Sequence, residues 1–229
     1  MGRVFAAAAL LAALAACTAT KGLEIKNTAQ LQGFMGDAYP LLQKGGEGQA
    51  ELRYVAPGVD WKQYHGTILE PIQFWAGSDS KLPPDVQQML STYLYNKLKE
   101  DLGKVGVNLV EMPGPGIMRA QLALTDVTSA TPVLRTVSLV IPQARVLNQA
   151  QELLTGTYGF SGSAEIALKV TDARTGQLLA AAIDRRGGGG NVEQAAQWKW
   201  GDAQAVIDHW SEMFANRIAE LKQRAQAAN

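Results

Sequence analysis

The first seventeen residues decide which part of the chain is left to fold. Arg3 is followed by residues 4–16, which contain no charged side chain, and this run ends in Leu-Ala-Ala immediately before Cys17. A short basic start, an apolar stretch shorter than the ~20 residues of a membrane-spanning helix, and a small-residue cleavage site are the three parts of a signal peptide. Residues 1–16 are therefore expected to be removed on export.

Cys17 directly follows the small residues, which is the arrangement of a bacterial lipobox, where the cysteine thiol accepts a diacylglyceryl group. It is the only cysteine of the 229 residues, so an exported chain of this sequence forms no intramolecular disulfide. Acyl chains contribute ~0.8 kcal/mol per buried methylene, so one chain holds a protein marginally and two or three hold it stably. The alternative is a chance cysteine or a free buried thiol. We expect a lipid on Cys17.

The residue after the cysteine indicates the membrane. Thr18 stands where an Asp would favour retention in the inner membrane. In a Gram-negative host, the expected location is therefore the periplasmic face of the outer membrane.

The balance of charges argues against one class of partner. The chain has 21 Lys and Arg against 21 Asp and Glu, and removing Arg3 with the signal peptide leaves 20 against 21. Nucleic-acid binding normally shows a basic excess or a basic face, and here basic residues are scattered among acids. We expect no nucleic-acid partner, and no later stretch is apolar for long enough to span a bilayer.

The mature chain is expected to hold one domain. About 210 residues remain after cleavage, and chains of this size bury ~70% of their unfolded surface. Residues 17–48 are polar and glycine-bearing, which indicates a lipidated cysteine followed by a tether and an extended lead-in. An apolar cluster within 34–42 is expected to dock on the domain, which is assigned to residues 49–229.

Apolar periodicity and turn residues predict the elements of that domain. Strands are expected at 49–55, 66–75, 105–112, 117–127, 163–171 and 177–185, and helices at 84–103 and from about 201 onward. Residues 105–112 and 117–127, joined by Pro-Gly-Pro-Gly, are expected to form a hairpin or meander, and so are the last two strands. Pro71 predicts an edge or a bulge in the second strand.

Two later segments and the overall arrangement complete the prediction. Residues 136–155 are expected to hold a strand and a short helix, and Gly187–Gly190 a loop. The order of elements predicts an α+β fold with a single largely antiparallel or mixed sheet and two main helices packed on it.

The usual signatures of catalysis and metal binding are not met. Ser161 lies in Gly-Phe-Ser-Gly, which places the first glycine as a hydrolase elbow does but lacks the rest of the Gly-x-Ser-x-Gly spacing. The only histidines, His65 and His209, are far apart in sequence. No metal site is expected, because a metal needs converging donors. The four consecutive glycines lack the Gly-Lys-Ser/Thr ending of a phosphate loop, and no cofactor is expected.

Carboxylates on predicted strands are the open candidates for acid–base chemistry. They are Glu70, Asp126, Glu165 and Asp184. Any protein with a sheet offers as many, so the pattern alone assigns no catalytic residue.

A partner surface is a second candidate site. Its residues are Arg185, Arg186, Trp198 and Trp200. The arginines would suit an anionic partner, or they would pair with acids such as Asp184. The tryptophans would form a contact surface for sugar, lipid or protein, or they would pack at the start of the last helix.

Three stretches, in this order, resemble a bacterial lipoprotein family catalogued as domain of unknown function 3313. They are Leu-Arg-Tyr-Val at 52–55 with Trp61, Asp-Ala-Arg-Thr-Gly at 172–176 running to Asp-Arg-Arg at 184–186, and Trp-Gly-Asp at 200–202 running to His-Trp at 209–210. The likeness covers nearly the whole mature chain. It implies an exported, lipid-anchored α/β domain and supplies no catalytic residue.

Three functions follow as hypotheses. The first is a non-enzymatic periplasmic binding or envelope-assembly lipoprotein that acts through a protein partner, and it is motivated by the anchor on Cys17. The second is a hydrolase or transferase that acts on envelope material with the strand carboxylates. The third is an immunity lipoprotein that neutralises an imported toxin.

Overall fold

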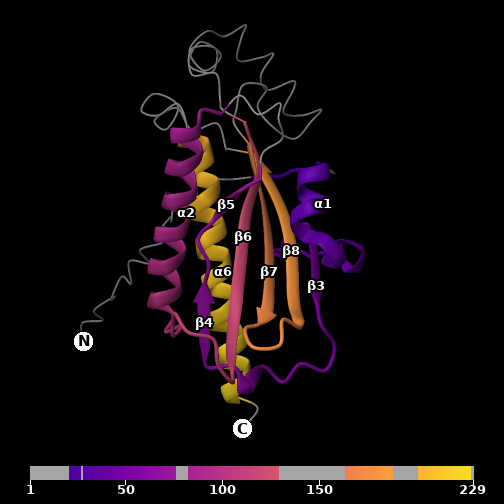
Figure 1. The fold of residues 1–229 in the computed structure, drawn as a ribbon, viewed down its shortest axis with the longest axis vertical. Helices are drawn as coiled ribbons and strands as arrows, with labels where there is room; N and C mark the ends of the chain where they lie inside the picture. The colour runs from indigo at the N-terminus through magenta and orange to yellow at the C-terminus, as the bar shows by residue number, and fades with distance from the viewer. Residues whose placement is uncertain (1–20, 27, 76–81, 129–162, 188–200, 228–229) are drawn as a thin grey trace, which may run out of the picture.

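The computed structural model describes residues 21–26, 28–75, 82–128, 163–187 and 201–227, and its core is one sheet with helices on both faces (Figure 1). Within these ranges the sheet has eight strands in the order β2-β3-β8-β7-β6-β4, while β1 pairs with β8 and β5 with β6. The strands are β1 Lys21–Gly22, β2 Gln43–Lys44, β3 Leu52–Val55, β4 Gly66–Leu69, β5 Gln73–Phe74, β6 Ile117–Thr128, β7 Ser163–Asp172 and β8 Leu178–Gly187. The expected α+β fold with a mixed, mostly antiparallel sheet is confirmed.

The β7–β8 hairpin forms where the sequence predicts it. Asp172 Oδ1 accepts hydrogen bonds from the backbone N–H groups of Arg174 (3.0 Å) and Thr175 (2.8 Å). Gly176 adopts a φ of +75°, which glycine tolerates without steric cost. The turn chemistry therefore fixes the register of the two long strands.

The predicted pairing of 105–112 with 117–127 is wrong. One edge of β6 pairs antiparallel with β7, and the other pairs parallel with β4 and β5. Both edges are occupied, so residues 105–112 make only an isolated bridge from Leu109 to Thr67. The predicted strand at 66–75 is divided at Pro71 into β4 and β5, as expected for a residue that cannot donate to the ladder.

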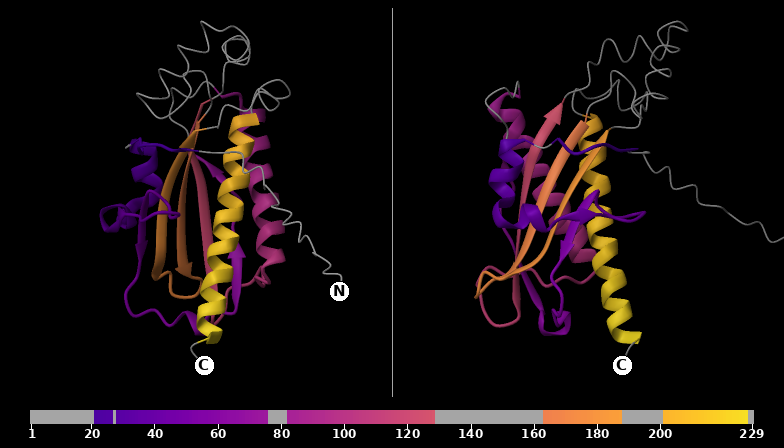
Figure 2. Two further views of the ribbon diagram at one scale, coloured as in Figure 1. Left: turned by 180° about the vertical axis from the view of Figure 1, so that it is seen from behind. Right: turned by 90° about the vertical axis from the view of Figure 1, so that its right-hand side faces the viewer.

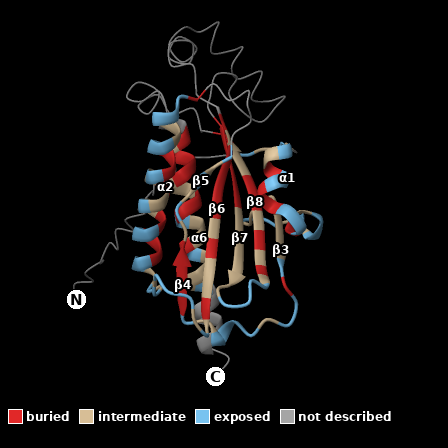
Figure 3. Ribbon diagram, in the orientation of Figure 1, coloured by how far each residue is buried: buried red, intermediate tan, exposed pale blue. Residues whose placement is uncertain are grey.

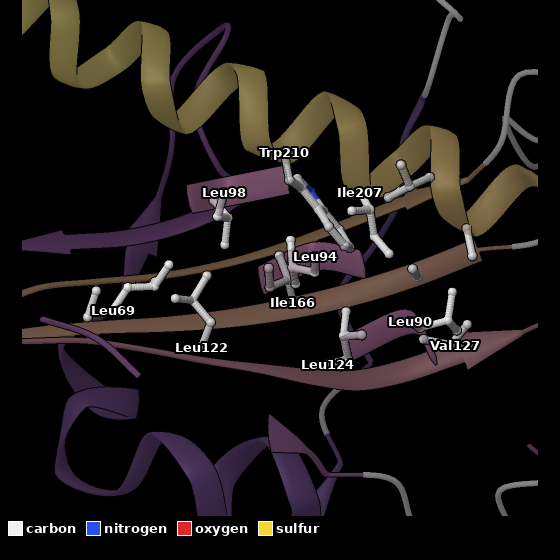
Figure 4. Packing of buried hydrophobic residues seen from close by; sticks show 14 of the residues in the cluster. Leu69, Leu90, Leu94, Leu98, Leu122, Leu124, Val127, Ile166, Ile207 and Trp210 are labelled. Carbon is white, nitrogen blue, oxygen red and sulfur yellow. The ribbon is translucent and has the colours of Figure 1, made fainter. Parts of the chain in front are cut away.

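Two long helices, α2 (Pro84–Lys104) and α6 (Gly201–Ala227), cover one face of the sheet. Pro84 occupies the first turn of α2, where a missing N–H costs little. Leu90, Leu94 and Leu98 of α2 are at most 1% exposed. They join Trp210 and Ile207 of α6 over the leucine-rich side of β6 and β7 (Figure 4). We call this side the α6 face.

The short helix α1 (Ala29–Met35) packs on the opposite side, which we call the α1 face. Figure 2 shows α1 and α6 on opposite sides of the strands. Thr28 Oγ1 caps α1 by accepting from the Leu31 N–H at 3.2 Å. The buried stripe of α1 faces the sheet (Figure 3) and includes Leu31 and Phe34. Two short 3-10 turns, η1 (Gly36–Leu41) and η2 (Trp61–Gln63), complete the described elements.

The segment expected to be a lead-in contributes to the folded domain. β1 pairs with the end of β8, β2 pairs with β3, and α1 buries its apolar side chains against Ala123, Ala167 and Ile183. The folded part therefore already includes Lys21, well before the expected boundary at residue 49. Residues 136–155 and 188–190 lie outside the described residues.

Candidate functional site

Charged residues gather where β6, β7 and β8 meet at one end of the sheet. The register places Asp126 opposite Glu165, and Glu165 opposite Arg185. Residues in register share a face, and their neighbours along each strand point to the other face. Asp126, Glu165 and Arg185 therefore lie on the α1 face, whereas Asp184 lies on the α6 face.

Glu165 is the buried centre of the group on the α1 face. Its side chain is fully buried, Oε2 accepts from the Lys26 backbone N–H at 2.9 Å, and Oε1 accepts from Thr125 Oγ1 at 2.8 Å. Burial raises the pKa of Glu165 above its ordinary value, against the opposing effect of these hydrogen bonds. Both carboxylate oxygens are thus committed to holding neighbouring chain in place.

Asp126 lies between two cations in the same group. Lys26 Nζ lies 2.8 Å from its Oδ2, and Arg185 Nη2 lies 3.6 Å from the same oxygen. Arg185 also donates to the backbone carbonyl of Glu24 (3.2 Å) and to Ser163 Oγ (3.1 Å). The Arg185 side chain therefore connects the N-terminal segment to β6 and β7.

We call this group the N-terminal clamp, because every member contacts residues 21–26 or supports a residue that does. Its members are Thr125, Asp126, Ser163, Glu165 and Arg185. The backbone adds to it, since Leu23 N donates to Arg185 O at 2.8 Å beyond the β1–β8 pairing. The clamp fixes the segment that begins at Lys21, with only three residues between it and Cys17.

Asp184 makes a separate group on the α6 face. Its side chain is 4% exposed, and it accepts from Arg186 Nε (2.7 Å), Trp210 Nε1 (2.8 Å) and the Glu51 N–H (3.1 Å). A buried carboxylate with three donors is well satisfied. Asp184 thus joins α6 and the entry to β3 to the central hairpin.

His209 lies beside this second group. Burial lowers the pKa of His209, the Arg186 guanidinium adds to that effect, and Asp184 opposes it. Within the described residues its Nε2 is buried without a hydrogen-bond partner. The surroundings of His209 therefore favour the neutral imidazole more than water does.

A third buried acid joins the two long helices to each other. Asp101 of α2 is 5% exposed, and it accepts from Ser211 Oγ of α6 at 2.8 Å and from Lys97 Nζ at 2.8 Å. Burial raises the pKa of Asp101, but the hydrogen bonds from Lys97, Lys104 and Ser211 outweigh it, so the pKa lies below its ordinary value. This contact fixes how α2 and α6 pack side by side.

The four candidate carboxylates do not converge. Asp126 and Glu165 share the α1 face, Asp184 lies on the other face, and Glu70 pairs with Arg119 several residues down β6. Each is engaged by a cation or by a hydrogen-bond donor of the chain itself. Glu165 and Asp184 are also closed to solvent, so neither contacts a substrate in this conformation.

The predicted partner surface is only partly described. Arg185 and Arg186 point to opposite faces, with side chains 14% and 15% exposed, and both pair with acids. Trp198, Trp200, Ser161 and Cys17 lie outside the described residues. His65 is exposed and far from the clamp, next to Gly116. In the ranges that the structure describes, no group of His, Cys, Asp and Glu is placed to hold a metal ion.

Sequence reasoning missed Lys26 and Thr125. Lys26 falls in the segment expected to be a lead-in, and its partner Glu165 is 139 positions away. Thr125 is directed to Glu165 by a register shift in β6 between Leu124 and Asp126. No local pattern signals either contact.

Residues 30–214 match the family model described as "Protein of unknown function (DUF3313)". The chain belongs to this family. The match spans α1, the whole central hairpin and the first half of α6, and no curated protein matches the DUF3313 chain.

Several solved structures are similar to this DUF3313 protein at low identity. A PelC dodecamer from Paraburkholderia phytofirmans is 9% identical with a TM-score of 0.40, over 70% of this chain and 93% of that chain. A hypothetical protein from Chlamydia trachomatis is 12% identical with a TM-score of 0.35, over 72% and 99%. A putative neuraminyllactose-binding hemagglutinin homolog from Helicobacter pylori is 9% identical with a TM-score of 0.34, over 77% and 86%.

Among the described residues, no helix is both long and apolar enough to cross a bilayer.

Proposed function

We propose that this DUF3313 protein is an envelope lipoprotein, anchored by lipid on Cys17, whose domain acts by binding a protein partner. The observation that carries the proposal is the short distance along the chain between Cys17 and the sheet. Three residues separate Cys17 from β1, and the clamp then holds residues 21–26 on the domain. A lipid on Cys17 would therefore hold the folded domain itself at the membrane surface.

The placement of the acids supports binding rather than catalysis. General acids and bases need to reach the proton that they transfer, at roughly hydrogen-bond distance. The carboxylate oxygens of Glu165 and Asp184 accept hydrogen bonds from donors of the chain itself. The Asp126 carboxylate pairs with two cations of the chain. These side chains organise the domain, which suits a scaffold whose outer surface meets a partner.

Lipid labelling tests the anchor. Cells that express the full chain with an alkyne fatty acid should yield labelled protein, and Cys17→Ser should abolish the label and block or change processing. Thr18→Ala is the matched control, because it leaves the cysteine in place and should keep the label. Equal labelling of wild type and Cys17→Ser would overturn the anchor.

The outer-membrane assignment has its own test. Thr18→Asp should move the labelled protein to the inner-membrane fraction on a density gradient of a Gram-negative envelope. A wild-type protein that already fractionates with the inner membrane would contradict the proposed location.

Crosslinking in intact envelopes tests the partner. Wild type should return the same envelope protein in repeated experiments, and the Cys17→Ser form, which lacks the lipid, should lose it.

Glu70→Gln and Asp126→Asn address the hydrolase or transferase alternative, because these two carboxylates are the partly exposed members of the candidate set. If either variant folds and still crosslinks to the partner but cannot restore the cellular function lost on deletion of the protein, the binding proposal fails.

A further inference from the structure

We infer that the end of the sheet where β1 pairs with the end of β8 faces the bilayer. We call it the anchor end, and it comprises β1, Leu23–Lys26 and the last residues of β6 and β8. The opposite end, which we call the turn end, carries the Asp172–Gly176 turn. The inference rests on the proposed lipid at Cys17.

Chain length sets how far the anchor end can lie from the lipid. Cys17 and Lys21 are four steps apart in sequence. A fully extended chain gains at most ~3.6 Å per residue, so the two Cα atoms are no more than about 14 Å apart. The acyl chains begin at Cys17, so the anchor end stays within about that distance of the membrane surface.

Strand direction shows at which end of the sheet β1 begins. β1 runs antiparallel to β8, and its first residue, Lys21, pairs with Gly187, the last residue of β8. β1 therefore begins at the anchor end of the sheet and runs toward the turn end. The ten residues of β8 span roughly 30 Å at ~3.3 Å each, which separates the turn end from the attachment point.

The clamp holds the start of β1 at the anchor end. Leu23 and Lys26 are bound through their N–H groups, and Lys26 Nζ is paired with Asp126. Peeling residues 21–26 from the sheet would leave the buried Glu165 carboxylate without a backbone donor, and an unsatisfied buried charge is costly. The segment is therefore expected to stay on the domain when the lipid is in the membrane.

Charge plays a minor part in this orientation at the membrane. Lys26, Arg185 and Arg186 lie at the anchor end, and each is paired with an acid of the domain. Paired cations have little charge left for anionic headgroups. The orientation is thus set by the short tether, and it should not depend on anionic lipid.

Site-directed quenching tests the orientation. The lipidated full chain carrying Glu24→Cys at the anchor end or Arg174→Cys at the turn end is labelled with a fluorophore and reconstituted in phosphatidylcholine vesicles that contain a headgroup-nitroxide lipid. Both native side chains are exposed, so the replacements should not disturb packing. We expect severalfold stronger quenching at position 24, with no change when phosphatidylglycerol is added.

A flexible Gly-Ser insertion between Thr20 and Lys21 is the matched control, and it should shrink the difference between the two positions. Acylated protein with equal quenching, or with stronger quenching at position 174, overturns the orientation and leaves the anchor standing. Protein without an acyl label overturns the anchor, and the orientation with it. A requirement for phosphatidylglycerol overturns the role of the tether.

Discussion

The two faces of the sheet are built from different residues and hold different parts of the chain. The α6 face carries large side chains such as Leu122 and Leu124, which pack on two long helices. The α1 face carries Ala123, Ala167 and Ala181, which admit one short helix, and beyond them the buried Glu165. One face is an apolar core, and the other is a close-fitting support for the N-terminal segment.

This difference separates stability from placement. Burial of apolar area contributes ~25 cal/mol per Å², so the larger buried cluster on the leucine-rich face is expected to contribute more to the free energy of folding than the cluster on the α1 face. Small side chains and a polar clamp contribute less, but they determine where residues 21–35 lie. The segment next to the proposed anchor is therefore positioned by the weaker face.

The largest effect is expected from Leu94→Ala on the α6 face. Leu94 is 0% exposed, and removing a buried leucine side chain leaves a cavity that costs about 3 kcal/mol of unfolding free energy. Urea denaturation followed by circular dichroism measures it. Met89→Ala is the control on the same helix, because Met89 is 41% exposed and should change stability by about 0.5 kcal/mol or less. Equal losses would show that the helix does not pack as described.

A smaller effect is expected from Ala167→Leu on the α1 face. Ala167 is 0% exposed beneath α1, and added methylenes in a packed site cost about 2 kcal/mol. Limited proteolysis should show earlier cleavage in residues 28–48 while α2 and α6 stay protected. Ala180→Leu, at a partly exposed position of β8, is the comparison and should leave that cleavage unchanged. No change in either variant would contradict close packing of α1.

Glu165→Gln should change how the free energy of unfolding depends on pH more than it changes the magnitude of that free energy. Burial raises the folded pKa of Glu165 above the ordinary value of 4.5, so between these two pKa values the folded protein keeps a proton that the unfolded chain has lost. Its contribution to unfolding free energy therefore falls as pH rises from about 4.5 through the raised pKa. Glu165→Gln removes this fall. The free energy of unfolding of the variant minus that of wild type should therefore increase as pH rises across that window, and then level off.

Urea denaturation at closely spaced pH values checks this prediction. Thr125→Ala is a useful comparison, because it removes one hydrogen bond to Glu165 and keeps the titrating carboxyl. A constant offset between Glu165→Gln and wild type at all pH values would contradict the burial of a titrating carboxyl.

Local patterns could predict much of the fold and little of the clamp. The turn at Asp172–Gly176 and the apolar stripe of α2 each depend on residues only a few positions apart, and both form as predicted. The pairing of β6 with β4 and β5 could not be inferred from residues 105–127, because the strands that occupy that edge come from residues 66–74, outside this segment.

The candidate site depends on contacts between distant residues. Asp184 appears as one more strand carboxylate until Trp210 and Glu51, 26 and 133 positions away, are placed beside it. Glu165 likewise gains its meaning from Lys26. Sequence spacing identified both acids as candidates, and only the fold shows that they hold the chain together.

Amide hydrogen exchange at Leu23 and Lys26 tests the central claim most directly. Both N–H groups donate to the clamp region, Leu23 to the Arg185 carbonyl and Lys26 to Glu165. In the mature chain they should exchange far more slowly than an unstructured peptide, and Glu165→Gln should speed exchange at Lys26 more than at Leu23. Exchange of both amides at the unstructured rate, while the β7 amides stay protected, would show that the segment after Cys17 is not clamped.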